Sequence, residues 1–98
     1  MAVTFGQKGC ESGQVCKVSE GGTVAPCGAG EKFCGIVEGV RGGFAAGQVA
    51  GFATVAVSGS VGVGYVSLCA DGQGGVKAGQ GREYLVVSVN ADTATIML

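Results

Sequence analysis

The stretch REYLVVSVNADTATIML, residues 82–98, consists of two apolar runs separated by a polar turn at residues 90–92. The side chains on each flank alternate as they do in the strands of a hairpin. In the first run Leu85, Val87 and Val89 share one face, and Tyr84, Val86 and Ser88 share the other. Because both faces are mainly apolar, we expect a central barrel strand or a strand whose outer face another subunit buries.

Upstream of residue 82 the same pattern recurs. Short runs rich in Val, Ile, Phe, Tyr and Thr are separated by glycine-bearing turns, which is typical of strands. The runs are KFCGIVEGV (32–40), QVAGFATVAV (48–57) and GYVSLCA (64–70). Residues 71–81, DGQGGVKAGQG, are expected to form a flexible loop. The predicted fold class is all-β, a small β-barrel or β-sandwich with Gly-rich turns and no substantial helix.

The length of 98 residues suits one domain with one modest core. We predict a single β domain over residues 1–98, with the core in 24–98. Residues 1–23 are poor in large apolar side chains, so they are the candidate for a less ordered N-terminal segment.

Charge is scarce and glycine is abundant in this chain. Charged residues make up 13% of it, and the net charge is -1, so no basic patch is expected for nucleic acid. Each of the 21 glycines costs about 0.5–1 kcal/mol of backbone entropy where alanine would fit. Subunit association can offset that cost. We therefore favour a surface covered by partner subunits over a stable monomer with a polar surface.

The middle of the chain has one feature of a membrane segment. Residues 42–70 carry no charge, and Gly43, Gly47 and Gly51 have the G-x-x-x-G spacing of packed membrane helices. The same segment contains the turn-like SGSVGVG and alternates with a strand period. We therefore expect strands here and no membrane partner.

The residue types that carry catalysis and metal binding are sparse. Histidine is absent, and Asp71, Glu83 and Asp92 are scattered over turns and strand edges. The five cysteines (Cys10, Cys16, Cys27, Cys34 and Cys69) contain no C-x-x-C pair, so we predict reduced thiols and no zinc site. A Cys10–Cys16 or a Cys27–Cys34 bridge remains open. We predict no enzyme, no catalytic residue and no cofactor.

The aromatic residues lie in apolar strands with few basic neighbours, which favours a core or an interface over nucleic-acid stacking. They are Phe5, Phe33, Phe44, Phe52, Tyr65 and Tyr84. As interface residues between protomers we predict Phe44, Phe52 and Tyr65.

From Val24 to Leu98 the chain resembles a family of small prophage-encoded proteins that decorate or cement phage heads. The likeness rests on the order of short motifs: CGIV (34–37), VRGGFAA (40–46), GFATV (51–55), ADGQGGVK (70–77) and GREYLVVSV (81–89). The resemblance implies an all-β protein that binds the outside of an assembled capsid, often as a trimer, and reinforces the shell. It supplies no catalytic residues to carry over.

The expected function is that of a structural virion protein, a homotrimer that binds the major capsid protein after synthesis in the bacterial cytoplasm without secretion. The alternative is a β-barrel module of a phage tail or cell surface that binds sugar or peptide. That module would need a concave face, for which Tyr65, Tyr84 and Glu83 are the candidates.

Overall fold

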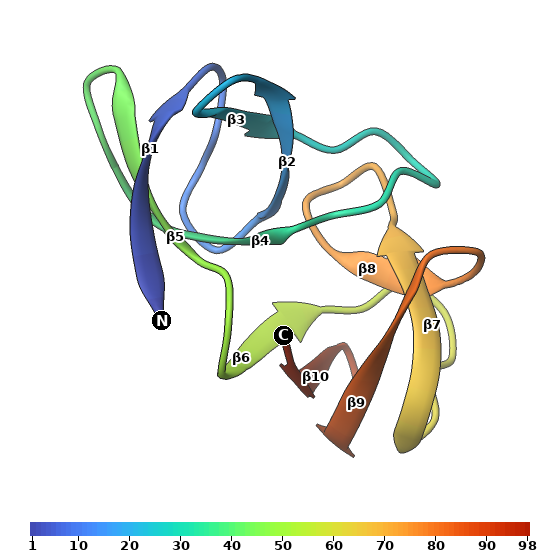
Figure 1. Ribbon diagram of the computed structural model, residues 1–98. Helices are drawn as coiled ribbons and strands as arrows, with labels where there is room; N and C mark the ends of the chain where they lie inside the picture. Colours follow the sequence, from blue (N-terminus) through green and yellow to red (C-terminus); the bar gives the residue numbers. More distant parts are fainter.

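The computed structural model describes residues 1–98 and contains ten strands and no helix (Figure 1). In chain order the strands are β1 (Ala2–Gln7), β2 (Val15–Glu20), β3 (Thr23–Pro26), β4 (Gly35–Arg41), β5 (Phe44–Gln48), β6 (Phe52–Ala56), β7 (Gly64–Ala70), β8 (Val76–Ala78), β9 (Arg82–Val89) and β10 (Thr93–Met97). The predicted all-β fold is confirmed, and it consists of a barrel followed by a second sheet.

The N-terminal half is a closed barrel in the order β1-β3-β2-β4-β5. Glycine turns form its hairpins, and at the β4–β5 turn Gly42 has a φ of 58°, a conformation that a side chain with a Cβ rarely adopts. Two of its ladders are short. The parallel β1–β3 ladder and the antiparallel β2–β4 ladder each register only two residue pairs, so the barrel closes over two narrow seams.

The C-terminal half is an antiparallel sheet in the order β6-β10-β9-β7-β8. β9 lies at the centre of this sheet, so it is a central strand as its two apolar faces predicted, but it does not belong to the closed barrel. A bulge between Thr95 and Ile96 shifts the register against β9. The sheet also curls back on itself, because Val57 forms a bridge with Val76 and the Ser58 N–H donates to the Val76 carbonyl at 2.9 Å.

Most of the core belongs to the C-terminal half but extends into the barrel. Its buried members are Val15, Cys27, Phe33, Ile36, Val55, Leu68, Ala70, Val76, Tyr84, Val86, Ala94 and Ile96. The Phe33 and Tyr84 rings stack with centroids 4.7 Å apart, and the Tyr84 hydroxyl donates to the Phe33 carbonyl at 2.9 Å. The barrel itself encloses a smaller cluster of Cys10, Cys16, Val24, Val37 and Ala45.

Backbone hydrogen bonds also join the two halves. The Ala70 N–H donates to the Glu31 carbonyl, and the Gly30 N–H donates to the Ala70 carbonyl, both at 2.8 Å. The Val15 N–H donates to the Gly74 carbonyl at 3.0 Å. The barrel and the sheet are therefore held together by main-chain bonds as well as by a shared core.

Three sequence expectations can be compared with this architecture. Residues 42–70 form β5, β6 and β7, as their strand period indicated, and the structure has no helix long and apolar enough to cross a membrane. Residues 71–81 were expected to be a loop, but this was wrong for β8, where buried Val76 pairs with Ala70. Residues 1–23 contain β1 and β2, both of which belong to the closed barrel.

Candidate functional site

The outer face of the C-terminal sheet carries a row of apolar side chains that crosses four neighbouring strands. Phe52 on β6 registers with Met97 on β10, Met97 registers with Leu85 on β9, and Leu85 registers with Tyr65 on β7. Residues that register directly across a sheet project from the same face. We call Phe52, Met97, Leu85 and Tyr65 the outer row.

The outer row is strongly exposed at its two ends. Phe52 is 61% exposed and Tyr65 is 72% exposed, while Met97 is 39% exposed and Leu85 is partly buried. Aromatic side chains have about 150–250 Å² each, so Phe52 and Tyr65 together present roughly 250 Å² to solvent. The largest apolar patch on a typical monomer is about 300–600 Å² and is often functional. The outer row therefore accounts for a large part of such a patch.

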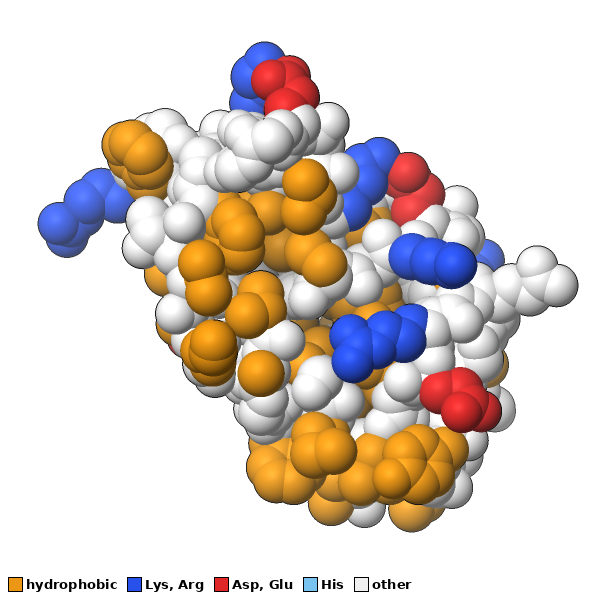
Figure 2. Space-filling view, in the orientation of Figure 1, with side chains coloured by type: hydrophobic (Ala, Val, Ile, Leu, Met, Phe, Trp, Pro, Cys, Tyr) orange, Lys and Arg blue, Asp and Glu red, His pale blue; other side chains and the backbone are white.

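Uncharged side chains lie beside the outer row. Thr54 of β6 and Thr95 of β10 are in register, and their hydroxyl oxygens lie 3.2 Å apart. Glu83 lies on the other side, in register with Ser67. Figure 2 shows hydrophobic side chains gathered in two areas of one face of the molecule, over the N-terminal half and at the lower end of the C-terminal sheet. The outer row is thus apolar along its length and has a carboxylate at one border.

The structure explains why this face stays apolar although it is not part of the core. Tyr84 and Val86 of β9 point inward and are 2% and 0% exposed, whereas Leu85 and Val87 point outward. The bulge opposite Thr95 places Ser88 on the surface although it alternates with the buried residues. β9 thus contributes one apolar face to the core and a second one to the surface.

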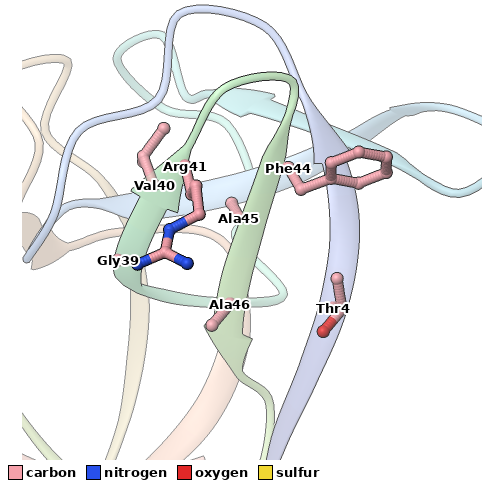
Figure 3. Close-up of a pocket in the computed structure, with 7 residues that line it drawn as sticks. All are labelled: Thr4, Gly39, Val40, Arg41, Phe44, Ala45 and Ala46. Carbon is pink, nitrogen blue, oxygen red and sulfur yellow. The ribbon is translucent and has the colours of Figure 1, made fainter.

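Phe44 lies apart from the outer row, at the β4–β5 hairpin of the barrel, and is 64% exposed. It borders an open pocket of about 550 Å³ on the outside of β1, β4 and β5. Small residues in the middle of this face, Gly39, Ala46 and Thr4, create the hollow. Figure 3 shows the Arg41 guanidinium beside Gly39 and Ala46, and the Phe44 ring extending toward β1, where its registered partner is Gly6.

Arg41 is an unpaired cation at this pocket. It is exposed, and neither of the two ion pairs of the chain, Lys8–Glu20 and Lys17–Glu31, involves it. The pocket therefore combines an apolar wall at Val40 and Phe44 with a cation that can receive a carboxylate from a partner. Of the predicted interface residues, the structure brings Phe52 and Tyr65 onto one sheet and leaves Phe44 on the other half.

The concave face expected for the sugar- or peptide-binding alternative is not present as predicted. Tyr65 and Glu83 lie on the outer face, but Tyr84 points to the opposite face and is buried against Phe33. Burial raises the pKa of Tyr84 although the nearby Arg82 opposes that change. Its hydroxyl is bonded to the Phe33 carbonyl, so it does not contribute to a surface binding site.

The acidic residues named from the sequence do not converge. Asp71 accepts hydrogen bonds from the Ser58 hydroxyl at 2.7 Å and from the N–H groups of Gln73 and Gly75. Burial disfavours its charged form, but these bonds outweigh burial and lower the Asp71 pKa. Glu83 and Asp92 are exposed at separate places. Asp71 thus anchors the turn after β7.

All five cysteines are free thiols, so neither of the bridges left open by the sequence is formed in this structure. Four of them are buried and Cys34 is partly exposed. No three His, Cys, Asp or Glu side chains are grouped so that they could hold a metal ion.

The sequence could not identify Met97 and Leu85 as partners of Phe52 and Tyr65. Their alignment depends on the registers of three ladders and on the bulge at Val87 of β9, which follow from the folded sheet. The signal that the sequence did offer for this face was its two exposed aromatic residues, Phe52 and Tyr65.

In comparisons with known proteins, no family model and no curated protein matches the chain.

Proposed function

We propose that the chain is a structural phage protein that binds the outer surface of the capsid and stabilises the head. In this proposal it acts by packing against copies of itself, as a homotrimer, and against the major capsid protein. The observation that carries the proposal is the outer row, an exposed apolar line across four strands of a well-packed sheet. The motif pattern along residues 24–98 supplies the phage-head context.

The size of the exposed aromatic surface supports association of copies. When two copies each cover Phe52 and Tyr65, roughly 500 Å² of apolar surface leaves water, which contributes about 12 kcal/mol at 25 cal/mol per Å². Association costs about 4–15 kcal/mol in lost translational and rotational freedom. Burial of the outer row is therefore of the magnitude needed for association, and the flanking contacts add to it.

Charge supports a second copy as the occupant of this face. In a trimer each copy places this face against a different surface of its neighbour. The outer row and the neighbouring Thr54 and Thr95 carry no charge, so such a contact buries no unpaired charge on this side. Glu83 at the border stays at the polar rim of such an interface. An uncharged apolar centre with a polar rim is the usual anatomy of a protein interface.

Phe44 and Arg41 provide a second surface on the other half of the molecule. In the proposed assembly the outer row is covered by neighbouring copies, and the pocket beside Arg41 remains free for the capsid. A decoration subunit needs both kinds of contact, one between copies and one to the shell. The two apolar areas lie on different halves of the chain, which allows both contacts at once.

The test is to compare phage heads assembled with and without this gene in the same host. We expect the chain in purified heads in stoichiometric amount, measured by quantitative mass spectrometry, and earlier DNA release on heating from heads that lack it. Phe44→Ser should reduce its incorporation into heads without changing its self-association. Absence of the chain from purified particles, or equal heat stability of both kinds of head, would contradict the proposal.

A further inference from the structure

Two cysteines meet at one of the narrow seams of the barrel. β2 registers with β4 only at Val15–Ile36 and Cys16–Gly35, after which β2 has no partner on that side. Cys34 immediately precedes β4, and its N–H donates to the Cys16 carbonyl at 2.9 Å. Cys16 and Cys34 are therefore neighbours across the seam.

The two sulfur atoms have different surroundings. Cys16 is 1% exposed and belongs to the small core of the barrel, whereas Cys34 is partly exposed. The Cys16 thiol donates to the Gly35 carbonyl at 3.6 Å, and the same proton can instead go to the neighbouring sulfur of Cys34, to which the Val18 N–H also bonds. The unpaired edge of β2 beyond Cys16 is what leaves the Val18 N–H available. The pair thus joins one accessible sulfur to one buried sulfur.

These contacts favour a thiolate on Cys34. The hydrogen bond from Cys16 outweighs burial and, with the backbone N–H bonds, lowers the pKa of Cys34 to about 6. The same hydrogen bond, together with burial, raises the pKa of Cys16. Cys27, by contrast, is kept protonated by burial and by Glu31, which raise its pKa to about 11.

We propose that Cys34 and Cys16 form a redox-active pair, in which Cys34 attacks a low-molecular-weight disulfide and Cys16 then resolves the product. In the first step the Cys34 thiolate bonds to one sulfur of the disulfide, whose S–S bond breaks and releases one thiolate. In the second step Cys16 gives its proton to that released thiolate and attacks the Cys34 sulfur. The mixed disulfide breaks, a second small thiolate leaves and takes up a proton from water, and a Cys16–Cys34 disulfide remains.

The second step becomes easier because of the first. The largest cause of the raised Cys16 pKa is its hydrogen bond to Cys34, and the charge on Cys34 adds to it. Once Cys34 is part of a mixed disulfide it carries no negative charge, so Cys16 loses its proton more readily. The two protein thiols are oxidised by two electrons, and the small disulfide is reduced to two thiols.

The product disulfide would close the seam covalently. It links β2 to the segment before β4, where the ladder registers only two residue pairs. A disulfide between residues 16 and 34 closes the chain between them into a loop and so restricts the conformations of the unfolded state. We expect the oxidised protein to unfold at a temperature higher by about 12–24 °C. This inference does not depend on the proposed assembly.

The test uses the native full chain and oxidised glutathione, followed by acid quenching, alkylation and peptide mapping by mass spectrometry. We expect a mass loss of two hydrogen atoms and a cross-linked peptide that joins Cys16 to Cys34. Cys16→Ala should instead stop at one glutathione on Cys34, and Cys34→Ser should react at least tenfold more slowly. Cys69→Ser is the matched control and should behave as the wild type does.

A second readout is alkylation of Cys34 by iodoacetamide as a function of pH. The wild type should react half-maximally near pH 6, and Cys16→Ala should shift this midpoint upward because the hydrogen-bond donor is gone. Circular dichroism establishes that each variant is folded. If a variant is unfolded, the peptide map of the oxidised wild-type protein by itself decides whether Cys16 and Cys34 form the disulfide. Five unmodified thiols after native treatment, or a cross-link between another pair of cysteines, would overturn the proposal.

Discussion

The barrel of β1–β5 and the sheet of β6–β10 are stabilised in different ways. The barrel closes on itself around a small cluster of cysteine, valine and alanine side chains. The sheet buries long side chains such as Leu68 and Ile96 and draws Phe33 and Ile36 of the barrel segment into its core. In the barrel, ring closure and main-chain hydrogen bonds compensate for the small size of the buried side chains. In the sheet, apolar side chains form both the core and an exposed face.

This difference leads to different expectations for substitutions in the two halves. A strand that is apolar on both faces contributes to the core with one face and leaves the other exposed, as β9 does. The barrel also exposes large apolar side chains, but none of them is in register with another. They are Met1, Val3, Val18, Val40 and Phe44. The sheet is therefore the half in which loss of a core side chain should destabilise most, and in which an exposed side chain should matter most for association.

The largest expected effect comes from shortening a core side chain of the sheet. Ile96 is fully buried, and Ile96→Ala should lower the free energy of unfolding by about 2–5 kcal/mol. Val24→Ala, the matched change in the barrel cluster, should cost about 1–3 kcal/mol because fewer methyl groups are removed. Urea denaturation measures both. A larger loss for Val24→Ala than for Ile96→Ala would reverse the comparison.

The next effect is at the junction of the two halves. Tyr84→Phe keeps the ring on Phe33 but removes the hydroxyl that satisfies the buried Phe33 carbonyl. The free energy of unfolding should fall by about 1–3 kcal/mol. Tyr65→Phe is the matched control, and because Tyr65 is exposed the change should stay within about 0.5 kcal/mol. Equal values for the two variants would show that the hydroxyl bond does not hold the halves together.

Asp71 gives a pH-dependent effect within the sheet. Its pKa lies below the ordinary value of 3.8, so its ionised form stabilises the fold above that pH and loses this contribution as the pH falls through the lowered pKa. Asp71→Asn should cost about 1–2 kcal/mol at pH 7, through weaker bonds to Ser58, Gln73 and Gly75. Urea titrations should show the difference from wild type shrinking toward pH 3. A difference that is constant with pH would exclude this role of the carboxylate.

Much of the sheet could be predicted from the sequence, and less of the barrel. Alternation over residues 82–98 and the turn at 90–92 predict the β9–β10 hairpin because that pairing is local. The parallel β1–β3 contact joins residues distant in the chain and leaves no periodic signal. β8 was missed because its short VKA run is surrounded by glycine, and only pairing with β7 makes it a strand. The exposed aromatics were named from the sequence, but the outer row depends on register.

The smallest effect on stability is expected at the outer row itself. Phe52→Ser should change the free energy of unfolding by no more than about 0.5 kcal/mol, because Phe52 is largely exposed and on an edge strand. The measurement is urea denaturation at protein concentrations low enough for the monomer to dominate. A large loss would mean that Phe52 supports the fold rather than an interface.

The most direct test of the central claim is sedimentation velocity at tens of micromolar. The wild type should sediment as a closed oligomer, with a trimer at three times the chain mass of 9.5 kDa, and the Phe52→Ser/Tyr65→Ser double variant should sediment as a monomer. Val18→Ser, a change at an exposed valine of the barrel, should leave the oligomer intact. A monomeric wild type, or a double variant that associates as the wild type does, would contradict the account.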